Sequence, residues 1–158
     1  MVIERTRLDG ATRAVGFEPA RSSAHRARVL LAEDDDDVRD AISSWLELFG
    51  YEVIPVTTGA ELLERMGSWL LENGEPPCDA IVTDVRMPGF NGLNIVEGLR
   101  DSGWTRPIVV ISAFGDDAMR ARIQGMDHVQ FLAKPFDPDS LVAAVSASTS
   151  EVLRGGSL

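Results

Sequence analysis

The stretch Asp79-Ala-Ile-Val-Thr-Asp-Val-Arg-Met-Pro-Gly-Phe-Asn-Gly92 decides the fold of this chain. Residues 80–83 form a short apolar and β-branched run, which is typical of a strand buried on both faces of a parallel sheet. Asp84 ends the run, and the Pro-Gly pair at 88–89 then breaks the chain. Because chemistry in open α/β sheets gathers outside the carboxyl ends of the strands, this carboxylate is placed as a reactive group would be. The alternative is an Asp that only caps a turn.

Strand patterns and helix patterns alternate five times along the chain. Besides the central strand at 79–84, buried-strand runs are expected at 29–32, 52–56, 107–111 and 129–133. Apolar stripes predict helices over 38–49, 62–70, 93–99, from 116–117 onward, and 138–153. This alternation predicts an α/β fold: a doubly wound, five-stranded parallel sheet of the flavodoxin-like type, with helices on both faces and right-handed crossovers.

Local signals indicate where the first two helices begin and end. Asp36 and Asp37 are expected to cap the start of the first helix, and Gly50 to end it. The stripe over 62–70 is interpreted as a single helix that stops at Asn73-Gly74.

Composition excludes several classes of protein. No apolar run approaches the roughly 18 residues that a membrane helix needs, and the N-terminus lacks the apolar core of a secretory signal. Cys78 is the only cysteine, so no internal disulfide can form and a reducing, cytoplasmic location is expected. Residues 1–28 hold six arginines against three acidic residues, a net charge of +3, which leaves −13 on the rest of the chain. So acidic a body disfavours nucleic acid, whose phosphates require Lys and Arg contacts.

Three segments are predicted along the chain. Residues 1–27 show no helical or strand period and are expected to form a flexible basic N-terminal extension. Residues 28–153 form the folded domain, and residues 154–158 a short C-terminal tail. Because the residues after the last helix are too few for an output domain, a stand-alone protein is expected, with a piece of a longer protein as the alternative.

Polar side chains follow four of the predicted strands. They are Glu33 and Asp34, Asp84, Ser112, and Lys134. Since the carboxyl ends of parallel strands meet at one edge of a sheet, a single crevice should collect all of them. Alone, each has an ordinary interpretation as a solvated strand end, a turn residue or a surface charge. However, Lys134 is the only lysine of the chain, and its place beside three carboxylates favours a functional site.

These groups together indicate phosphoryl chemistry. Clustered carboxylates raise one another's pKa, and a bound divalent cation relieves that repulsion. Mg²⁺ prefers oxygen ligands and keeps several waters, so two carboxylates and a backbone carbonyl suffice to hold it. Asp84 can then attack phosphorus to form an aspartyl phosphate. Ser112 and Lys134 can bind the phosphoryl oxygens, and Ala113 leaves room for the group to enter.

Four motifs carry a resemblance to a known family. They are Val29-Leu-Leu-Ala-Glu-Asp34, Thr83-Asp-Val-Arg-Met-Pro-Gly-Phe-Asn-Gly92, Ile111-Ser-Ala113 and Leu132-Ala-Lys-Pro-Phe136. With them, residues 28–153 resemble the receiver domain of bacterial two-component response regulators, of the chemotaxis-regulator type. The resemblance implies a switch in phosphorelay signal transduction that assists its own phosphotransfer and dephosphorylation, not an enzyme with a separate substrate.

The resemblance also implies roles for individual residues. Asp84 is the phosphoacceptor. Asp34 is the direct ligand of Mg²⁺, the cofactor, with Glu33 acting beside it through water and the backbone carbonyl of Arg86 completing the site. The switch pair is the hydroxyl of Ser112 and the aromatic ring of Phe131, and Lys134 pairs with the phosphoryl group.

Two spacings depart from the family pattern. Asp34 and Asp84 are 50 residues apart, slightly more than usual, and the excess fits the second helix and the loop at 74–77. Gly125 to Phe131 is about two residues longer than usual, which predicts a shifted or frayed fourth helix.

Three competing functions are each disfavoured by particular residues. A phosphatase of the haloacid dehalogenase class also uses an Asp at a strand end, but it requires a second Asp where Arg86 stands. A flavodoxin-like cofactor carrier needs a first loop that accepts phosphate, which the acidic run 33–37 would repel. A degenerate receiver would lack site residues that are present in this sequence.

The implied partners are proteins. A histidine kinase or phosphotransfer protein would supply the phosphoryl group. A separate downstream effector protein or a second copy of the chain would bind the surface that phosphorylation changes. Neither membrane nor nucleic acid is expected as a partner.

Overall fold

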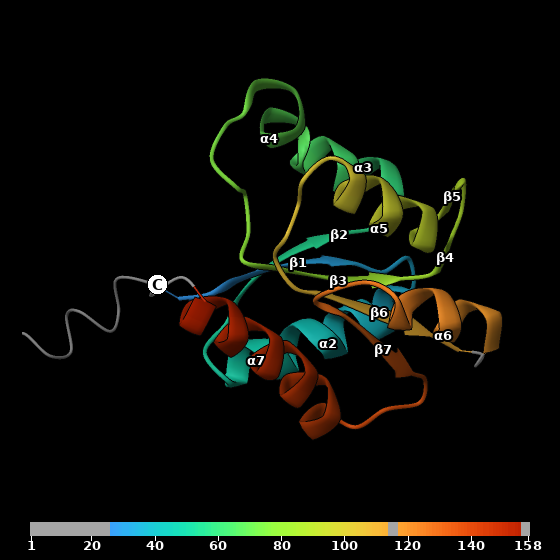
Figure 1. The fold of residues 1–158 in the computed structure, drawn as a ribbon. Coiled ribbons are helices and arrows are strands. Elements are labelled where there is room, and N and C mark those ends of the chain that lie inside the picture. The colour runs from blue at the N-terminus through green and yellow to red at the C-terminus, as the bar shows by residue number, and fades with distance from the viewer. Residues whose placement is uncertain (1–25, 114–116, 156–158) are drawn as a thin grey trace, which may run out of the picture.

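The computed structural model describes the backbone of residues 26–113 and 117–155, and the side chains of these residues up to residue 147. Its main sheet consists of β1 (Arg28–Ala32), β2 (Glu52–Val56), β3 (Ala80–Asp84), β6 (Ile108–Ser112) and β7 (Val129–Ala133) (Figure 1). The helices are α2 (Asp36–Leu48), α3 (Gly59–Arg65), α4 (Gly67–Glu72), α5 (Gly92–Asp101), α6 (Asp117–Gln124) and α7 (Pro138–Gly155). The extension and tail predicted for 1–27 and 154–158 lie largely outside the described residues.

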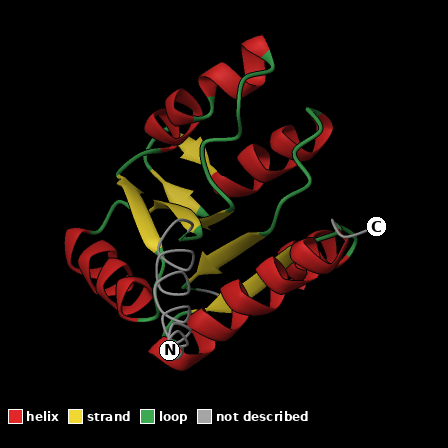
Figure 2. Cartoon of the chain, turned by 90° about the vertical axis from the view of Figure 1, so that its left-hand side faces the viewer, coloured by secondary structure: helices red, strands yellow, loops and turns green. Residues whose placement is uncertain are grey.

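The predicted doubly wound parallel sheet is confirmed. Its strands are ordered β2-β1-β3-β6-β7, and all four neighbouring pairs are parallel. Helices α2 and α7 cover one face, whereas α3 and α5 lie on the other, and the strands form the layer between them (Figures 1 and 2). The stretch from Asp79 to Gly92 therefore supplies β3, the central strand.

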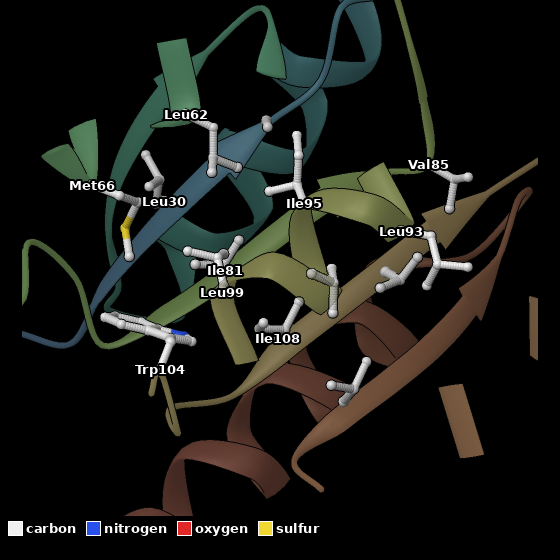
Figure 3. Packing of buried hydrophobic residues seen from close by; sticks show 14 of the residues in the cluster. Leu30, Leu62, Met66, Ile81, Val85, Leu93, Ile95, Leu99, Trp104 and Ile108 are labelled. Carbon is white, nitrogen blue, oxygen red and sulfur yellow. The ribbon is translucent and has the colours of Figure 1, made fainter. Parts of the chain in front are cut away.

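The central strands are buried on both faces, as their unbroken apolar runs predict. Neighbouring residues of one strand point to opposite layers, so Leu30 and Ile81 pack with α3 and α5, whereas Leu31 and Val82 pack with α2 and α7. Figure 3 shows the first of these two layers, in which Trp104 lies close to the side chains around Ile81. Two helical layers thus hold the strand ends in register, which is what positions the polar residues at those ends.

The prediction of a single helix over 62–70 is wrong. The chain forms two short helices, α3 and α4, that meet at Met66. Met66 is fully buried, but α4 has no buried residue, and its Trp69 packs edge-on against Trp104 with ring centroids 5.1 Å apart. The second half of the predicted helix is thus a separate short helix whose Trp69 packs on an aromatic partner far along the chain.

Three local predictions also need correction. Asp35 caps α2, because its side chain accepts a hydrogen bond from the backbone N–H of Val38, and Asp36 and Asp37 lie in the first turn instead. The segment after β3 is a small antiparallel hairpin of β4 (Arg86–Met87) and β5 (Phe90–Asn91), where only a turn was expected. Ser112 belongs to β6 itself and pairs with Ala133, whereas it was expected in the following loop.

Other helix boundaries agree with the sequence. Gly50 follows α2 with a φ of +93°, a conformation that suits glycine at a helix end. The last helix runs to Gly155, two residues beyond the predicted end at 153. The inward positions Leu141, Val142 and Val145 are buried as predicted.

Candidate functional site

The sheet brings the predicted polar residues to one edge. Four of its strands end side by side, because Ala32 pairs with Thr83, Asp84 with Ile111, and Ser112 with Ala133. Glu33 follows β1, Asp84 ends β3, Ser112 ends β6 and Lys134 follows β7. The β4–β5 hairpin and α6 lie at this end of the sheet (Figure 1). Parallel pairing alone therefore collects side chains from residues 33 to 134 in one crevice.

Lys134 bridges two buried carboxylates in this crevice. Its Nζ donates hydrogen bonds to Oε1 of Glu33 and to Oδ2 of Asp84, both at 2.8 Å. The Glu33 side chain is fully buried, that of Asp84 is 9% exposed and that of Lys134 is 22% exposed. The only ammonium side chain of the protein thus joins residues that are 101 and 50 positions away in the sequence.

Two further hydrogen bonds, one from a backbone N–H and one from a side chain, hold Glu33 in place. Its Oε2 accepts a hydrogen bond from the N–H of Asp35 at 3.1 Å, and its carbonyl accepts one from Nη1 of Arg39 at 2.9 Å. Burial raises the pKa of Glu33 above its usual value, and the negative charge of Asp84 adds to this, while the bonds from Lys134 and Asp35 oppose it. Glu33 is therefore a fixed carboxylate whose charge is destabilised by its surroundings.

Two causes shift the pKa of Lys134 in opposite directions. Burial by itself lowers this pKa, but the hydrogen bonds to Asp84 and Glu33 outweigh it and raise the pKa above the usual value for lysine. Lys134 accordingly stays charged at neutral pH. Its charge offsets only part of the negative charge that three neighbouring carboxylates bring.

The three predicted acidic residues form a cluster that suits a divalent cation. Carboxylate oxygens of Glu33, Asp34 and Asp84 all lie within 4.8 Å of one another, and Asp34 is exposed to solvent. Hard cations such as Mg²⁺ take oxygen ligands of this kind, and an exposed carboxylate leaves room for the waters that Mg²⁺ keeps. The donor set and the uncompensated negative charge therefore both fit the predicted ion.

Arg86 lies beside this cluster through its backbone. It is the first residue of β4, and its N–H donates to Oδ1 of Asp84 at 3.1 Å. Each carboxylate oxygen of Asp84 thus has a defined donor, since Oδ2 is bonded to Lys134. This arrangement fixes the orientation of the carboxylate at the end of the central strand.

The predicted switch residues occupy neighbouring strands. Ser112 is 2% exposed at the end of β6, and its carbonyl accepts a hydrogen bond from the N–H of Lys134 at 2.7 Å. Phe131 lies on β7 and is half-buried against the α5 and α6 layer, where the guanidinium of Arg120 stands 4.3 Å from its ring centroid. The structure therefore places Ser112, on β6, at the crevice. Phe131, on the neighbouring strand β7, lies outside it.

Sequence reasoning missed a glycine that shapes the crevice. A Cβ built on Gly92 would overlap the carbonyl oxygen of Asp84, and the N–H of Gly92 donates to the carbonyl of Val85 at 2.7 Å. Only glycine permits this close approach of two backbones. A glycine that follows a strand–turn segment by a few residues was the available signal.

An apolar groove opens beside the crevice. It has a volume of about 570 Å³ and lies between α2 and the chain that follows β7. Its lining includes Val38 and Trp45 from α2, Ala113, and the Lys134-Pro135-Phe136 run. The groove thus reaches from the protein surface to the residue that bridges Glu33 and Asp84.

Comparison with known proteins gives a consistent result. Residues 29–146 match the family model described as the response regulator receiver domain. The transcriptional regulatory protein FixJ of Azorhizobium caulinodans is 35% identical over 120 residues, which cover 76% of this chain and 54% of that protein. Response regulator MprA of a Mycobacterium species is also 35% identical, over 76% of this chain and 49% of its own length. The chain therefore spans about half the length of these curated relatives.

Solved structures agree with these matches. A response regulator receiver protein from Sinorhizobium medicae has 28% sequence identity and a TM-score of 0.68, over 80% of this chain and 96% of that one. The chemotaxis response regulator CheY4 of Vibrio cholerae has 25% identity and a TM-score of 0.66, over 78% of this chain and 99% of its own. Among the described residues, none of the helices is both long enough and apolar enough to cross a bilayer.

Proposed function

The chain belongs to the response regulator receiver domain family, and we propose that it works as a phosphorylation-controlled switch whose phosphoacceptor is Asp84. The observation that supports this most directly is the bridge from Lys134 to Asp84 and Glu33 at the carboxyl edge of the sheet. A structural ion pair needs only one carboxylate, whereas phosphoryl transfer needs a nucleophile, a cation site and a phosphate partner in one place.

Glu33, Asp34 and Asp84 would hold Mg²⁺ together with the backbone carbonyl of Arg86. When bound, the ion would supply charge neutralisation for the incoming phosphoryl group. We also propose a separate role for each of the two neighbouring acids, Glu33 and Asp34. In this proposal Asp34 is the direct ligand and Glu33 acts beside it through water, as the family resemblance implies; Asp34 is exposed and Glu33 fully buried.

The covalent step is carried by Asp84. A carboxylate oxygen attacks phosphorus of a phosphohistidine or an acyl phosphate, so that a P–O bond to Asp84 forms while the P–N or P–O bond to the donor breaks. The departing imidazole takes up a proton, or the acyl group leaves as a carboxylate. Lys134 then exchanges its bond to Asp84 for one to a phosphoryl oxygen, and the hydroxyl of Ser112 donates to another.

Output follows from the new charge. The phosphoryl group adds about −1.5 to −2 charge and three acceptor oxygens near Ser112 and Lys134. As Ser112 moves toward it, Phe131 can turn inward behind β6, and burying this ring leaves no unsatisfied polar group. The equilibrium shifts by as much as the phosphoryl group favours one state over the other. The surface formed by α6, β7 and α7 changes as a result.

The partners of this switch are proposed from the same site. A histidine kinase or phosphotransfer protein would deliver the phosphoryl group, and the apolar groove beside Lys134 gives such a protein a surface next to the crevice. A separate effector protein, or a second copy of the chain, would bind the altered α6–β7–α7 surface. We infer a cytoplasmic location, because the single cysteine is buried and free.

The test is mass spectrometry of the intact protein after incubation with acetyl phosphate and Mg²⁺. Wild type should gain one phosphoryl group that hydroxylamine removes, and Asp84→Asn should gain none. Asp37→Asn changes an exposed acid next to the same crevice and should be labelled like wild type. Equal labelling of Asp84→Asn and wild type would overturn the assignment.

A further inference from the structure

Gly59 begins α3 directly against the β4–β5 hairpin. A Cβ built on Gly59 would lie 2.6 Å from Cβ of Phe90 and 2.8 Å from Cδ1 of Ile95. Both distances are far shorter than a van der Waals contact between carbons, so any side chain at position 59 must displace a neighbour. Ile95 Cδ1 is the end of a flexible side chain and can turn away. Phe90 Cβ is attached to the hairpin backbone, so the hairpin itself has to move.

The helix on the other side of this contact cannot retreat. Thr58 caps α3, since its side chain accepts a hydrogen bond from the N–H of Glu61 at 3.1 Å. The Glu61 carboxylate in turn accepts one from the N–H of Thr57 at 3.2 Å. Leu62, in the first turn, is fully buried in the core. The start of α3 is thereby fixed by its cap and by packing.

The hairpin transmits the contact to the crevice. Phe90 pairs with Met87, and the adjacent Asn91 pairs with Arg86, whose N–H is bonded to Asp84. Asn91 is also fixed at its other end, because its side chain accepts a hydrogen bond from the N–H of Leu93 at 2.8 Å. A displacement of Phe90 therefore falls on the short strand that sets the backbone of Arg86.

We propose that Gly59 is a positioning residue for the cation site. By leaving no side chain against Phe90, it keeps the hairpin, and with it the Arg86 carbonyl, in place beside Asp84. This inference rests on the proposed function, because the carbonyl matters only if the crevice binds Mg²⁺. Gly59, at the start of α3, would thus affect the affinity for the metal without touching the metal itself.

The decisive variant is Gly59→Ala in the full 158-residue chain. Gly59 lies in a helix without a left-handed φ, so alanine suits its backbone and by helix propensity alone would leave folding unharmed or improved. If the contact positions Arg86, the Kd for Mg²⁺ should instead rise roughly tenfold, as it does when outer partners of a metal site are changed. The Kd is measured by titrating Mg²⁺ and following tryptophan fluorescence. In ¹H–¹⁵N spectra recorded without Mg²⁺, the amide signals of Arg86 and Met87 in Gly59→Ala should differ from those of wild type.

Gly67→Ala is the matched control. Gly67 also begins a helix, α4, and a Cβ at that position meets nothing within 4 Å. This variant should keep the wild-type Kd. A double variant then tests the contact itself. Because Phe90→Gly removes the Cβ that alanine would strike, adding Gly59→Ala to Phe90→Gly should give the same Kd as Phe90→Gly alone. Phe90→Gly alone should weaken Mg²⁺ binding to a similar extent, because the hairpin loses its support.

The outcomes separate this inference from the proposed function. If wild type shows no Mg²⁺ response, the proposed function fails and the inference fails with it. If wild type binds Mg²⁺ and Gly59→Ala binds it equally well, the inference alone is overturned. Should Gly59→Ala not fold, Phe90→Gly decides the matter, and a wild-type Kd in that variant would overturn the positioning role.

Discussion

Lys134→Met should destabilise the protein by an amount that depends on pH. Methionine keeps much of the apolar stem but removes the ammonium that bonds to Glu33 and Asp84 at 2.8 Å. Two carboxylates then remain without their charged partner, one fully buried and the other 9% exposed. Removing one member of a buried ion pair is strongly destabilising, by about 3–5 kcal/mol where no relief is available.

Protonation of Glu33 limits this loss. Its unfolded pKa is near 4.5, and each pKa unit corresponds to about 1.36 kcal/mol, so holding a proton at about pH 7 costs roughly 3.4 kcal/mol. Once the penalty of the buried charge exceeds that figure, Glu33 becomes neutral instead. At about pH 5.5 the same limit is only roughly 1.4 kcal/mol. The expected loss is therefore about 3 kcal/mol at neutral pH and about 2 kcal/mol less at pH 5.5.

The sign follows from proton linkage. Loss of Lys134 raises the pKa of Glu33 in the folded state further above its unfolded value. Between these two values the folded protein binds more protons than the unfolded chain, so stability falls as pH rises through this window. The variant should accordingly be closest to wild type in acid.

Urea unfolding followed by tryptophan fluorescence, without divalent cations, measures these free energies. Arg106→Met is the control, because Arg106 forms a 3.0 Å ion pair with Asp79 in which the side chains are 35% and 38% exposed. Such a pair contributes about 1 kcal/mol or less, and its loss should not vary with pH in this range. A loss below 1 kcal/mol for Lys134→Met at neutral pH, or one that fails to shrink at pH 5.5, would refute the reasoning.

Three further predictions address the site, the switch and the core. Asp34→Ala should lose the Mg²⁺-dependent gain in stability, which for wild type is about 1.4–2.7 kcal/mol at ten to a hundred times Kd; an equal thermal shift in the variant would contradict the ligand assignment. A beryllofluoride mimic of the phosphoryl group should change amide NMR signals across α6, β7 and α7, and changes restricted to the Asp84 crevice would exclude the coupling to Phe131. Burial raises the pKa of the Cys78 thiol to about 12, so the folded protein should resist thiol reagents near pH 8 and react only in denaturant. Rapid modification of the native protein would show that Cys78 is accessible.

Much of the site could be predicted because the signals that indicate it lie within short stretches of sequence. Apolar β-branched runs and helical stripes indicate five strand–helix units whatever the position of each segment in the fold. Parallel strands that are joined by crossover helices have their carboxyl ends at one edge, so residues just after each strand must meet there. Glu33, Asp84, Ser112 and Lys134 could thus be assigned to one crevice without knowledge of the strand order.

Where several residues had equal local preference, the sequence could not choose between them. Four consecutive aspartates, 34–37, all favour a helix start, and in the folded chain it is Asp35 whose side chain caps α2. The stripe at 62–70 fits one helix, yet Trp69 packs on Trp104, which lies 35 residues further along the chain. Contacts between distant segments decide such cases, and no local period encodes them.

The sequence by itself determined the fold class, the alternation of the five sheet strands with helices, and the residues that share the crevice, because these depend on periods and strand ends within short segments. Only the tertiary structure decided the order β2-β1-β3-β6-β7, the bridge of Lys134 to both Glu33 and Asp84, and the hairpin that rests on Gly59. A two-residue strand pair such as β4–β5 has too few hydrogen bonds to persist alone. In the folded protein Phe90 lies directly against Gly59 at the start of α3, a contact between segments about thirty residues apart that no local pattern encodes.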